Sequence, residues 1–462
     1  MKSIILSAIV LFFISTPLKA QDGYRIEVKI KNLEDSVCYL GYYFGDKRYI
    51  KDTVDATSGT MVFQGPEKLT GGIYFIYTPS HYFEIVMDET QHFSIETDTV
   101  DFIGKMQVVN SPDNVLFRDL RIFIGARQKK AASLSERLKA AKGTPEEKEI
   151  TEQLAALEKE VVAYQDELIA KHPESFTALV LKATRRLEIP DPPRDAEGNV
   201  TDQEFQFRYY KKHFFDHIDF TDSRFLRTSF FHDKVNEFLE KLTVQHPDSV
   251  TAAAKYLIDK TGDNKEMFRY MLVTLAGKYE TSEIMGMDKV FVELAEKYYL
   301  TGRAEWADTT VINKIRRKVN DIKPNLIGNK APQLVLYDSL ERPVNALSLK
   351  SDFTILFFFD PDCGHCKTTA PKLKAIYNDL KAKGAEVIGV SSAPELEGMK
   401  KFMKELDLPW LSFADLAGQR KPYNIYSTPV IYILDHEKKI IAKRLDVDQI
   451  PGFLDHQIKM RK

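Results

Sequence analysis

The period of hydrophobic and polar positions changes twice along the chain and divides it into three segments. In the first, the stretch GYRIEVKI alternates Tyr24, Ile26, Val28 and Ile30 with polar residues, which is the pattern of a half-buried strand. Similar runs follow as VCYLGYYF, TMVFQG, GIYFIYT, YFEIVMD, HFSIET and MQVVN, with Gly, Asp and Pro between them. Many short strands separated by turn residues predict an all-β, sandwich-like domain over residues 21–110.

Residues 111–325 show helical periodicity instead. Thr144, followed by Pro145 and then Glu147, predicts a capping box at the start of a helix. After it, apolar residues recur at alternating spacings of four and three from Ile150 to Leu168. This row of apolar residues is too short for a long coiled coil, and it favours a helical hairpin with residues 116–141.

Two later stretches of the helical segment look alike. AKHPESFTALVLKA and VQHPDSVTAAAKYL both place His-Pro, an acid and Ser before an apolar run, so we expect helices capped by Ser175 and Ser249. Two copies alone do not establish a repeat. His213 and His217 stand one helical turn apart, but no third ligand accompanies them, so we expect no metal there.

From residue 326 onward, strands alternate with helices. FTILFFF and AEVIGVS are continuous apolar runs, as expected for strands covered on both faces, and PVIYILD and KIIAKRL are further strands. Helical patterns lie between and after them, in GHCKTTAPKLKAIYNDLKAKG, ELEGMKKFMKEL and DQIPGFLDHQIKM. This order predicts βαβ units on a mixed sheet, and therefore an α/β domain over residues 326–462.

The length of the chain indicates several domains, and its net charge argues against one class of function. A chain of 462 residues exceeds the size of one ordinary core, which agrees with several domains. The formal net charge of −2 argues against a nucleic-acid-binding protein, which normally has a basic excess.

The first twenty residues have the order of a secretory signal peptide. Lys2 precedes an apolar run from Ile4 to Ile14, and the small residue Ala20 ends the stretch. The run is shorter than the ~20 residues that span a bilayer. We expect a cleaved signal peptide over residues 1–20 and a periplasmic mature chain without a membrane span. The alternative is an uncleaved anchor that holds the protein at the inner membrane, facing the periplasm.

The sequence contains three cysteines, and two of them are close together. Cys38 lies in a predicted strand, where it is either a small core residue or a spare reactive thiol. Cys363 and Cys366 form Cys-Gly-His-Cys. Structural zinc normally needs a second pair of ligands, and a disulfide across so short a loop stabilises little. Copper remains a minor alternative, since two thiolates suit a soft ion.

The position of Cys363 favours a redox reagent over these structural roles. It follows a buried strand and begins a helix, where unpaired backbone N–H groups and the helix dipole stabilise a thiolate. Cys366 is one turn further on and can close the disulfide. A positive charge on His365 lowers the thiol pKa further, whereas the two aspartates before Cys363 oppose this. We therefore assign the catalytic disulfide to Cys363 and Cys366, and the tuning of the pKa to His365 and Gly364.

The stretch CGHCKTTAPKL resembles the thioredoxin superfamily motif Cys-x-x-Cys-Lys-x-x-Ala-Pro-x-Leu, and Cys-Gly-His-Cys is the form seen in protein disulfide isomerases. STPVIYILD resembles the cis-proline loop of that superfamily. The resemblance implies that Pro429 is cis beside the cysteines and that the backbone of Thr428 pairs with a substrate strand. IGNKAPQL and LPWLSFAD resemble exported proteins of the TlpA/ResA type, and the likeness covers residues 326–462. The β and helical segments resemble uncharacterised domains found before such domains.

The sequence departs from the family pattern at three positions. Phe357 stands six residues before the first Cys, where thioredoxins have a buried Asp that helps to deprotonate the second Cys. Asp362 replaces the usual Trp, and Ala393 is nearest to the place of a Glu in ResA-like proteins. Proton transfer to Cys366 then lacks an obvious partner, and either Glu395, Glu397 or water serves instead.

Together these features predict an exported thiol–disulfide oxidoreductase that exchanges disulfides with partner proteins. Its expected partners are protein disulfide or dithiol substrates and a redox partner in the periplasm or membrane. We expect no cofactor and no resident metal, and the sequence leaves the direction of electron flow open. About two-thirds of the mature chain has no catalytic motif. The main alternative is therefore a binding protein in which the thioredoxin-like domain is accessory.

Overall fold

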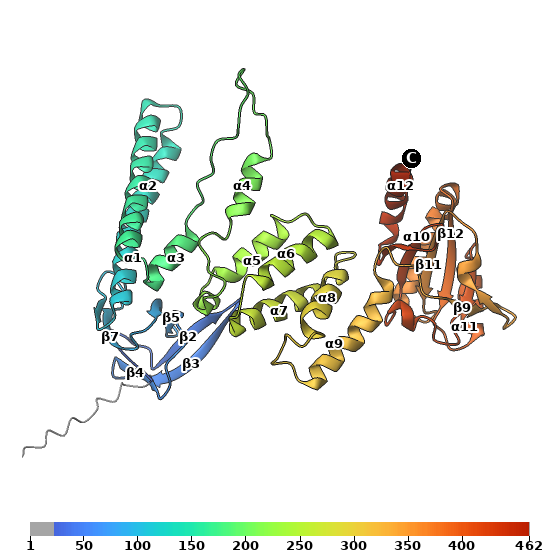
Figure 1. The fold of residues 1–462 in the computed structure, drawn as a ribbon, viewed down its shortest axis with the longest axis horizontal. Helices are drawn as coiled ribbons and strands as arrows, with labels where there is room; N and C mark the ends of the chain where they lie inside the picture. Colours follow the sequence, from blue (N-terminus) through green and yellow to red (C-terminus); the bar gives the residue numbers. More distant parts are fainter. Residues whose placement is uncertain (1–22, 462) are drawn as a thin grey trace, which may run out of the picture. The chain divides into compact units, whose positions relative to one another are not determined.

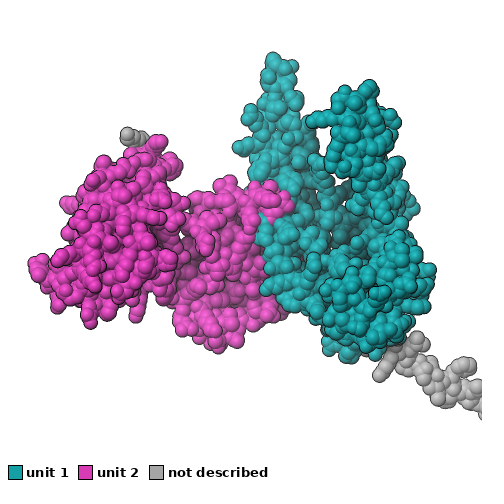
Figure 2. Space-filling view, turned by 180° about the vertical axis from the view of Figure 1, so that it is seen from behind, with its two compact units in different colours: residues 1–236 teal, residues 237–462 magenta. Residues whose placement is uncertain are grey.

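The computed structural model describes residues 23–461 of the chain (Figure 1). The predicted signal peptide lies outside the described residues. The chain divides into two compact units, residues 1–236 and 237–462, which Figure 2 shows in teal and magenta. No helix within the described residues combines the length and apolar character that a membrane span requires.

The strands of the first unit form two sheets that pack against each other. One sheet has the order β4-β1-β7-β8 and the other β3-β2-β5-β6. Inward side chains such as Ile26, Leu40, Phe63 and Ile85 belong to one buried cluster that both sheets share. The sandwich-like prediction is therefore confirmed. The bounds are β1 Tyr24–Lys31, β2 Val37–Phe44, β3 Lys47–Asp55, β4 Thr60–Gly65, β5 Gly72–Tyr77, β6 Tyr82–Met87, β7 His92–Asp98 and β8 Gln107–Val109.

Strand β3 is absent from the sequence prediction. It pairs antiparallel with β2 along its whole length and lies at the edge of its sheet. Most of its side chains, including Tyr49 and Ile50, are exposed, so its sequence KRYIKDTVD lacks the alternation that marks a half-buried strand. Cys38 on β2 is fully buried, and burial raises its pKa to about 12, which fits the small core residue rather than a reactive thiol.

The predicted helical hairpin is formed by α1 (Pro112–Ala140) and α2 (Pro145–Lys171). Phe123 and Tyr164 stack across it with ring centroids 3.9 Å apart. The predicted capping box is wrong in detail. The Glu147 carboxylate accepts from the backbone N–H of Gly143 at 2.7 Å, and the Thr144 hydroxyl donates to a backbone carbonyl instead of capping α2.

Of the two serines expected to cap later helices, one is an N-cap and the other is not. Ser175 caps α3 and accepts from the backbone N–H of Ala178 at 3.1 Å, as predicted. The Ser249 prediction is wrong, because the cap of α6 is His246, three residues earlier, and the helix begins at Pro247. Proline suits the first helical position, where its missing N–H costs nothing. The bounds are α3 Phe176–Thr184, α4 Phe205–His213, α5 Phe231–Glu240, α6 Pro247–Asp259, α7 Lys265–Glu280, α8 Asp288–Leu294 and α9 Thr309–Ile322.

The C-terminal α/β domain is built on a mixed sheet with the order β10-β9-β13-β12-β11-β14-β15. Strand β11 is parallel to β12 and antiparallel to β14. The predicted mixed sheet and α/β class are therefore confirmed. The bounds are β9 Val335–Tyr337, β10 Pro343–Asn345, β11 Phe353–Phe359, α10 Gly364–Ala382, β12 Ala385–Ser391, α11 Leu396–Glu405, β13 Leu411–Ala414, β14 Val430–Leu434, β15 Ile440–Lys443 and α12 Ile450–Arg461.

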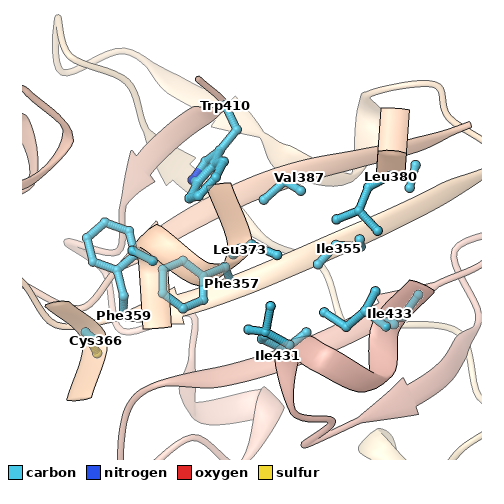
Figure 3. Packing of buried hydrophobic residues seen from close by; sticks show 14 of the residues in the cluster. Ile355, Phe357, Phe359, Cys366, Leu373, Leu380, Val387, Trp410, Ile431 and Ile433 are labelled. Atoms are coloured by element: carbon cyan, nitrogen blue, oxygen red, sulfur yellow. The ribbon is translucent and has the colours of Figure 1, made fainter. Parts of the chain in front are cut away.

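The continuous apolar sequence of β11 follows from burial of both sheet faces. Ile355, Phe357 and Phe359 point into the cluster that α10, α11 and α12 cover, part of which Figure 3 shows. Leu356 and Phe358 point into a second cluster on the opposite face. Because successive side chains of a strand alternate between faces, both sets are apolar only when both faces are covered. The first cluster also contains Cys366, so the core reaches the candidate site.

Candidate active site

Cys363 lies between the end of β11 and the start of α10. It is the N-cap residue of α10, with extended backbone (φ −75°, ψ 121°), and it is partly exposed. Its sulfur lies 3.5 Å from the carbonyl oxygen of Thr428. Gly364 begins the helix, and a Cβ added there would meet no heavy atom within 4 Å. The surface next to Cys363 is therefore open.

Cys366 lies one turn into α10 and is fully buried in the core of the domain (Figure 3). Its sulfur accepts a hydrogen bond from the backbone N–H of Asp360 at 3.4 Å. Both cysteines are free thiols in this structure. The motif thus places one thiol at the surface and the other beneath it.

The two thiols differ in acidity for reasons that the geometry supplies. The pKa of Cys363 is lowered, chiefly by hydrogen bonding from the backbone N–H of Cys366, and the Cys366 thiol and the backbone N–H of His365 act in the same direction. These N–H groups belong to the first turn of α10, where they have no helical acceptor. Burial raises the pKa of Cys366 to about 11.

The Thr428–Pro429 peptide is cis, as the resemblance to a cis-proline loop implies. The loop leads directly into β14, which pairs antiparallel with β11. This pairing carries Thr428 to the same end of the sheet as Cys363, although the two residues are 65 positions apart. The fold therefore brings the cysteine motif and the cis-proline loop together.

Asp360 makes a network of contacts in the turn before Cys363. Besides its bond to Cys366, its carbonyl oxygen accepts from the backbone N–H of Cys363 at 3.1 Å. Its carboxylate accepts from the backbone N–H of Asp362 at 2.9 Å and from the Ser392 hydroxyl at 3.4 Å. From the sequence, Asp360 is expected only to disfavour the Cys363 thiolate by its negative charge. Its position directly after the buried strand is the signal that could have indicated these contacts.

The positions that depart from the family pattern occupy different environments. Phe357 is fully buried and stacks with Phe359 at 5.4 Å between ring centroids, so apolar packing fills the place of the thioredoxin Asp. Ala393 is buried as well. Glu395 and Glu397 are both exposed at the start of α11, and Glu397 pairs with Lys400 at 2.8 Å. Neither glutamate shares the buried surroundings of Cys366.

His213 and His217 both line one cavity of about 480 Å³, which His365 does not line. The His365 side chain is exposed on the first turn of α10. His213 ends α4 and contacts Asp216 at 2.6 Å, whereas His217 lies beyond the helix, so the expected one-turn pair on a helix is not formed. Within residues 23–461, no group of three or more His, Cys, Asp or Glu side chains is arranged to hold a metal ion.

Comparison with known families assigns each part of the chain separately. Residues 327–443 match the AhpC/TSA family. Residues 24–117 and 146–325 match two domains of unknown function, DUF4369 and DUF5106. The two upstream matches therefore assign no activity to residues 24–117 and 146–325.

Several characterised proteins and solved structures are similar to the C-terminal part. ResA, a thiol–disulfide oxidoreductase of Bacillus thuringiensis, is 27% identical over 118 residues, which are 25% of this chain and 68% of ResA. ResA of Oceanobacillus iheyensis is 26% identical over 144 residues, covering 29% and 75% of the two chains.

Among solved structures, a domain of a possible thiol-disulfide isomerase from Cytophaga hutchinsonii is 34% identical, with coverage of 29% of this chain and 95% of that domain and a TM-score of 0.28. A thioredoxin-like protein of Bacteroides caccae is 20% identical, covers 59% of this chain and 98% of its own, and has a TM-score of 0.45.

The family match and the ResA relatives coincide with the domain that carries the cysteine motif and the cis-proline loop. The predicted resemblance and enzyme class are confirmed. Residues 327–443 are a thioredoxin-like domain of the AhpC/TSA family, and the chain is a multidomain thiol–disulfide oxidoreductase similar to ResA.

Proposed function

We propose that this oxidoreductase works outside the cytoplasm and exchanges disulfides with partner proteins through Cys363 and Cys366. The observation that carries the proposal is the difference between the two thiols. Cys363 is accessible and has a lowered pKa, whereas Cys366 is buried and has a pKa of about 11. A nucleophile must ionise and reach its target, and a resolving thiol must be kept from other targets.

In the reducing direction, the Cys363 thiolate attacks one sulfur of a partner disulfide. The partner S–S bond breaks, a Cys363–partner disulfide forms, and the other partner sulfur leaves as a thiolate that takes up a proton. Cys366 then loses its proton and attacks the sulfur of Cys363, which releases the second partner thiolate. The partner gains two electrons and two protons, and Cys363 and Cys366 become a disulfide. The same steps in reverse oxidise a partner dithiol.

Neighbouring groups have defined parts in this scheme. The carbonyl of Thr428 faces Cys363 across 3.5 Å, where an incoming peptide would pass over the sulfur. The backbone N–H of Asp360 stabilises the Cys366 thiolate that forms during resolution, because hydrogen bonds to a charged sulfur favour ionisation. The scheme uses protein groups only.

Export and domain organisation are parts of the same proposal. The first twenty residues have the order of a cleavable signal peptide, which would place the mature chain in the periplasm, where disulfides are permitted. In this scheme residues 21–110 and 111–325 are separate β and helical domains before the catalytic domain at 326–462. A redox partner in the periplasm or membrane would return Cys363 and Cys366 to their starting state.

Insulin reduction in the presence of dithiothreitol tests the proposed exchange. The mature protein should accelerate the precipitation of the insulin B chain. The matched control is the Cys363→Ser/Cys366→Ser double variant, which lacks both thiols of the motif and should be inactive. Equal rates with both proteins would contradict the proposal.

A further inference from the structure

We infer that the helical segment before the thioredoxin-like domain forms one wall of the substrate groove. The groove would bind an extended segment of a partner protein whose cysteine is flanked by apolar residues. This inference rests on the proposed exchange with protein disulfides. It assigns a role in partner selection to residues 280–322, for which the comparisons give no function.

A cavity of about 610 Å³ lies beside the cis-proline loop. It is lined by Thr369 of α10, by Tyr426 and Pro429 of the loop, and by Arg444 after β15. A second cavity of about 280 Å³ shares Asn424, Tyr426 and Arg444 with the first. Because they share these lining residues, the two cavities adjoin and form one groove that begins at Pro429.

The far wall of the second cavity comes from the helical segment. The loop between α7 and α8 lines it from Ser282 to Gly286, and Lys318 and Ile322 of α9 line it as well. Met285 in this loop also packs against the core of the thioredoxin-like domain. A partner chain that followed the groove away from Pro429 would therefore contact the helical segment next.

Polar contacts, some buried and some exposed, hold this wall in place. The Lys443 ammonium, which is 6% exposed, pairs with Asp288 at 2.5 Å and donates to the carbonyl of Asn325 at 2.7 Å. The Asn325 amide in turn donates to the carbonyl of Pro422, and the Tyr426 hydroxyl donates to Asp321 at 3.3 Å. The last two contacts join the helical segment to the chain that leads into the cis-proline loop.

The side chains along the groove indicate what it binds. Tyr426 is 78% exposed and Ile284 is 56% exposed, and both side chains line the second cavity. The charged lining residues have both signs, with Arg444 and Lys318 against Glu283 and Glu280. A strongly charged partner therefore gains little, whereas an apolar side chain would be buried against Ile284 and Tyr426.

Two cystine peptides test the inference on the full mature chain. They differ only at the positions flanking the cysteine, which carry Leu in one peptide and Asp in the other. Wild-type protein should reduce the Leu peptide with a kcat/KM about tenfold higher, as expected for burial of one apolar side chain. Ile284→Asp should abolish this ratio, and Ile284→Lys should shift it toward the Asp peptide. The matched control is Val273→Asp on α7, which is 48% exposed and lies outside both cavities, and it should keep the wild-type ratio.

Three outcomes would overturn the inference. The first is a wild-type ratio near one, and the second is a ratio that Ile284→Asp leaves unchanged. The third is a wild-type protein that sediments as a dimer and an Ile284→Asp variant that sediments as a monomer, which would assign the groove to a second copy of the chain. A wild-type protein that fails to reduce even a small aromatic disulfide would instead contradict the proposed function.

Discussion

The backbone N–H of Asp360 donates a hydrogen bond to the sulfur of Cys366 at 3.4 Å. The carbonyl oxygen of the same residue accepts from the N–H of Cys363, so the turn that begins at Asp360 holds both cysteines. Its carboxylate stabilises this turn through Asp362 and Ser392. Asp360 thus acts on both cysteines through backbone geometry, in addition to its negative charge.

Asp360→Ala should therefore loosen the turn and weaken the contact with Cys366. We expect a loss of about 1–2 kcal/mol in the free energy of unfolding, because two side-chain hydrogen bonds disappear. We also expect slower resolution of the mixed disulfide, measured by mass spectrometry of acid-quenched samples. Asp360→Asn is the matched control, since its amide oxygen can still accept from Asp362. If Asn slows resolution as much as Ala, the charge matters rather than the turn.

Alkylation of the reduced protein should discriminate among the three cysteines. The pKa of Cys363 is lowered, whereas those of Cys366 and Cys38 are raised to about 11 and about 12. As pH falls, the thiolate of Cys363 therefore persists longest. Iodoacetamide at about pH 6 should label Cys363 first, as read by peptide mass spectrometry. Preferential labelling of Cys366 would reverse the assigned roles.

His365→Pro should lower the reduction potential by tens of millivolts, where roughly 30 mV corresponds to 1.4 kcal/mol. A cation or an N–H donor beside Cys363 stabilises the thiolate, which exists only in the reduced form. Proline removes both the imidazole and one of the backbone N–H groups that lower the pKa of Cys363, since the N–H of Cys366 remains. Equilibration against glutathione measures the potential. His365→Ala keeps the N–H and isolates the contribution of the imidazole. An unchanged or higher potential in the proline variant would refute tuning at this position.

A fragment of residues 326–462 should fold alone and reduce a small aromatic disulfide. The α/β domain has its own core on both sheet faces. The fragment should unfold at lower denaturant concentration than the full chain, because Lys443 loses its partner Asp288. Circular dichroism and the reaction rate provide the two measurements. A folded but inert fragment would show that the active site needs the helical segment.

Local patterns predicted most of the fold because they reflect burial. The apolar run of β11 and the alternation of β1 correspond to strands with two covered faces and one covered face. Strand β3 was missed for the same reason, since an exposed edge strand leaves no such pattern. The Ser249 cap was wrong because Pro247 is an equally good helix start, three residues before the start that a Ser249 cap would give.

The candidate site was predictable where its parts are close in sequence. The position of Cys363 at a helix start follows from the strand before it and the helical pattern after it. The contact between Asp360 and Ser392 spans 32 positions, and that between Tyr426 and Asp321 spans 105. Such contacts depend on how the sheet and the helical segment pack, which local periodicity does not specify.

In the proposed exchange, Cys363 attacks the partner disulfide and Cys366 resolves the mixed disulfide. Trapping of the mixed disulfide tests it most directly. Cys366→Ser leaves the nucleophile and removes the resolving thiol, whereas Cys363→Ser leaves only a buried thiol with a raised pKa. Each variant is incubated with insulin, quenched with acid and analysed by intact mass. We expect a stable adduct through Cys363 on Cys366→Ser and none on Cys363→Ser. An adduct on Cys363→Ser, or on neither variant, would contradict these roles.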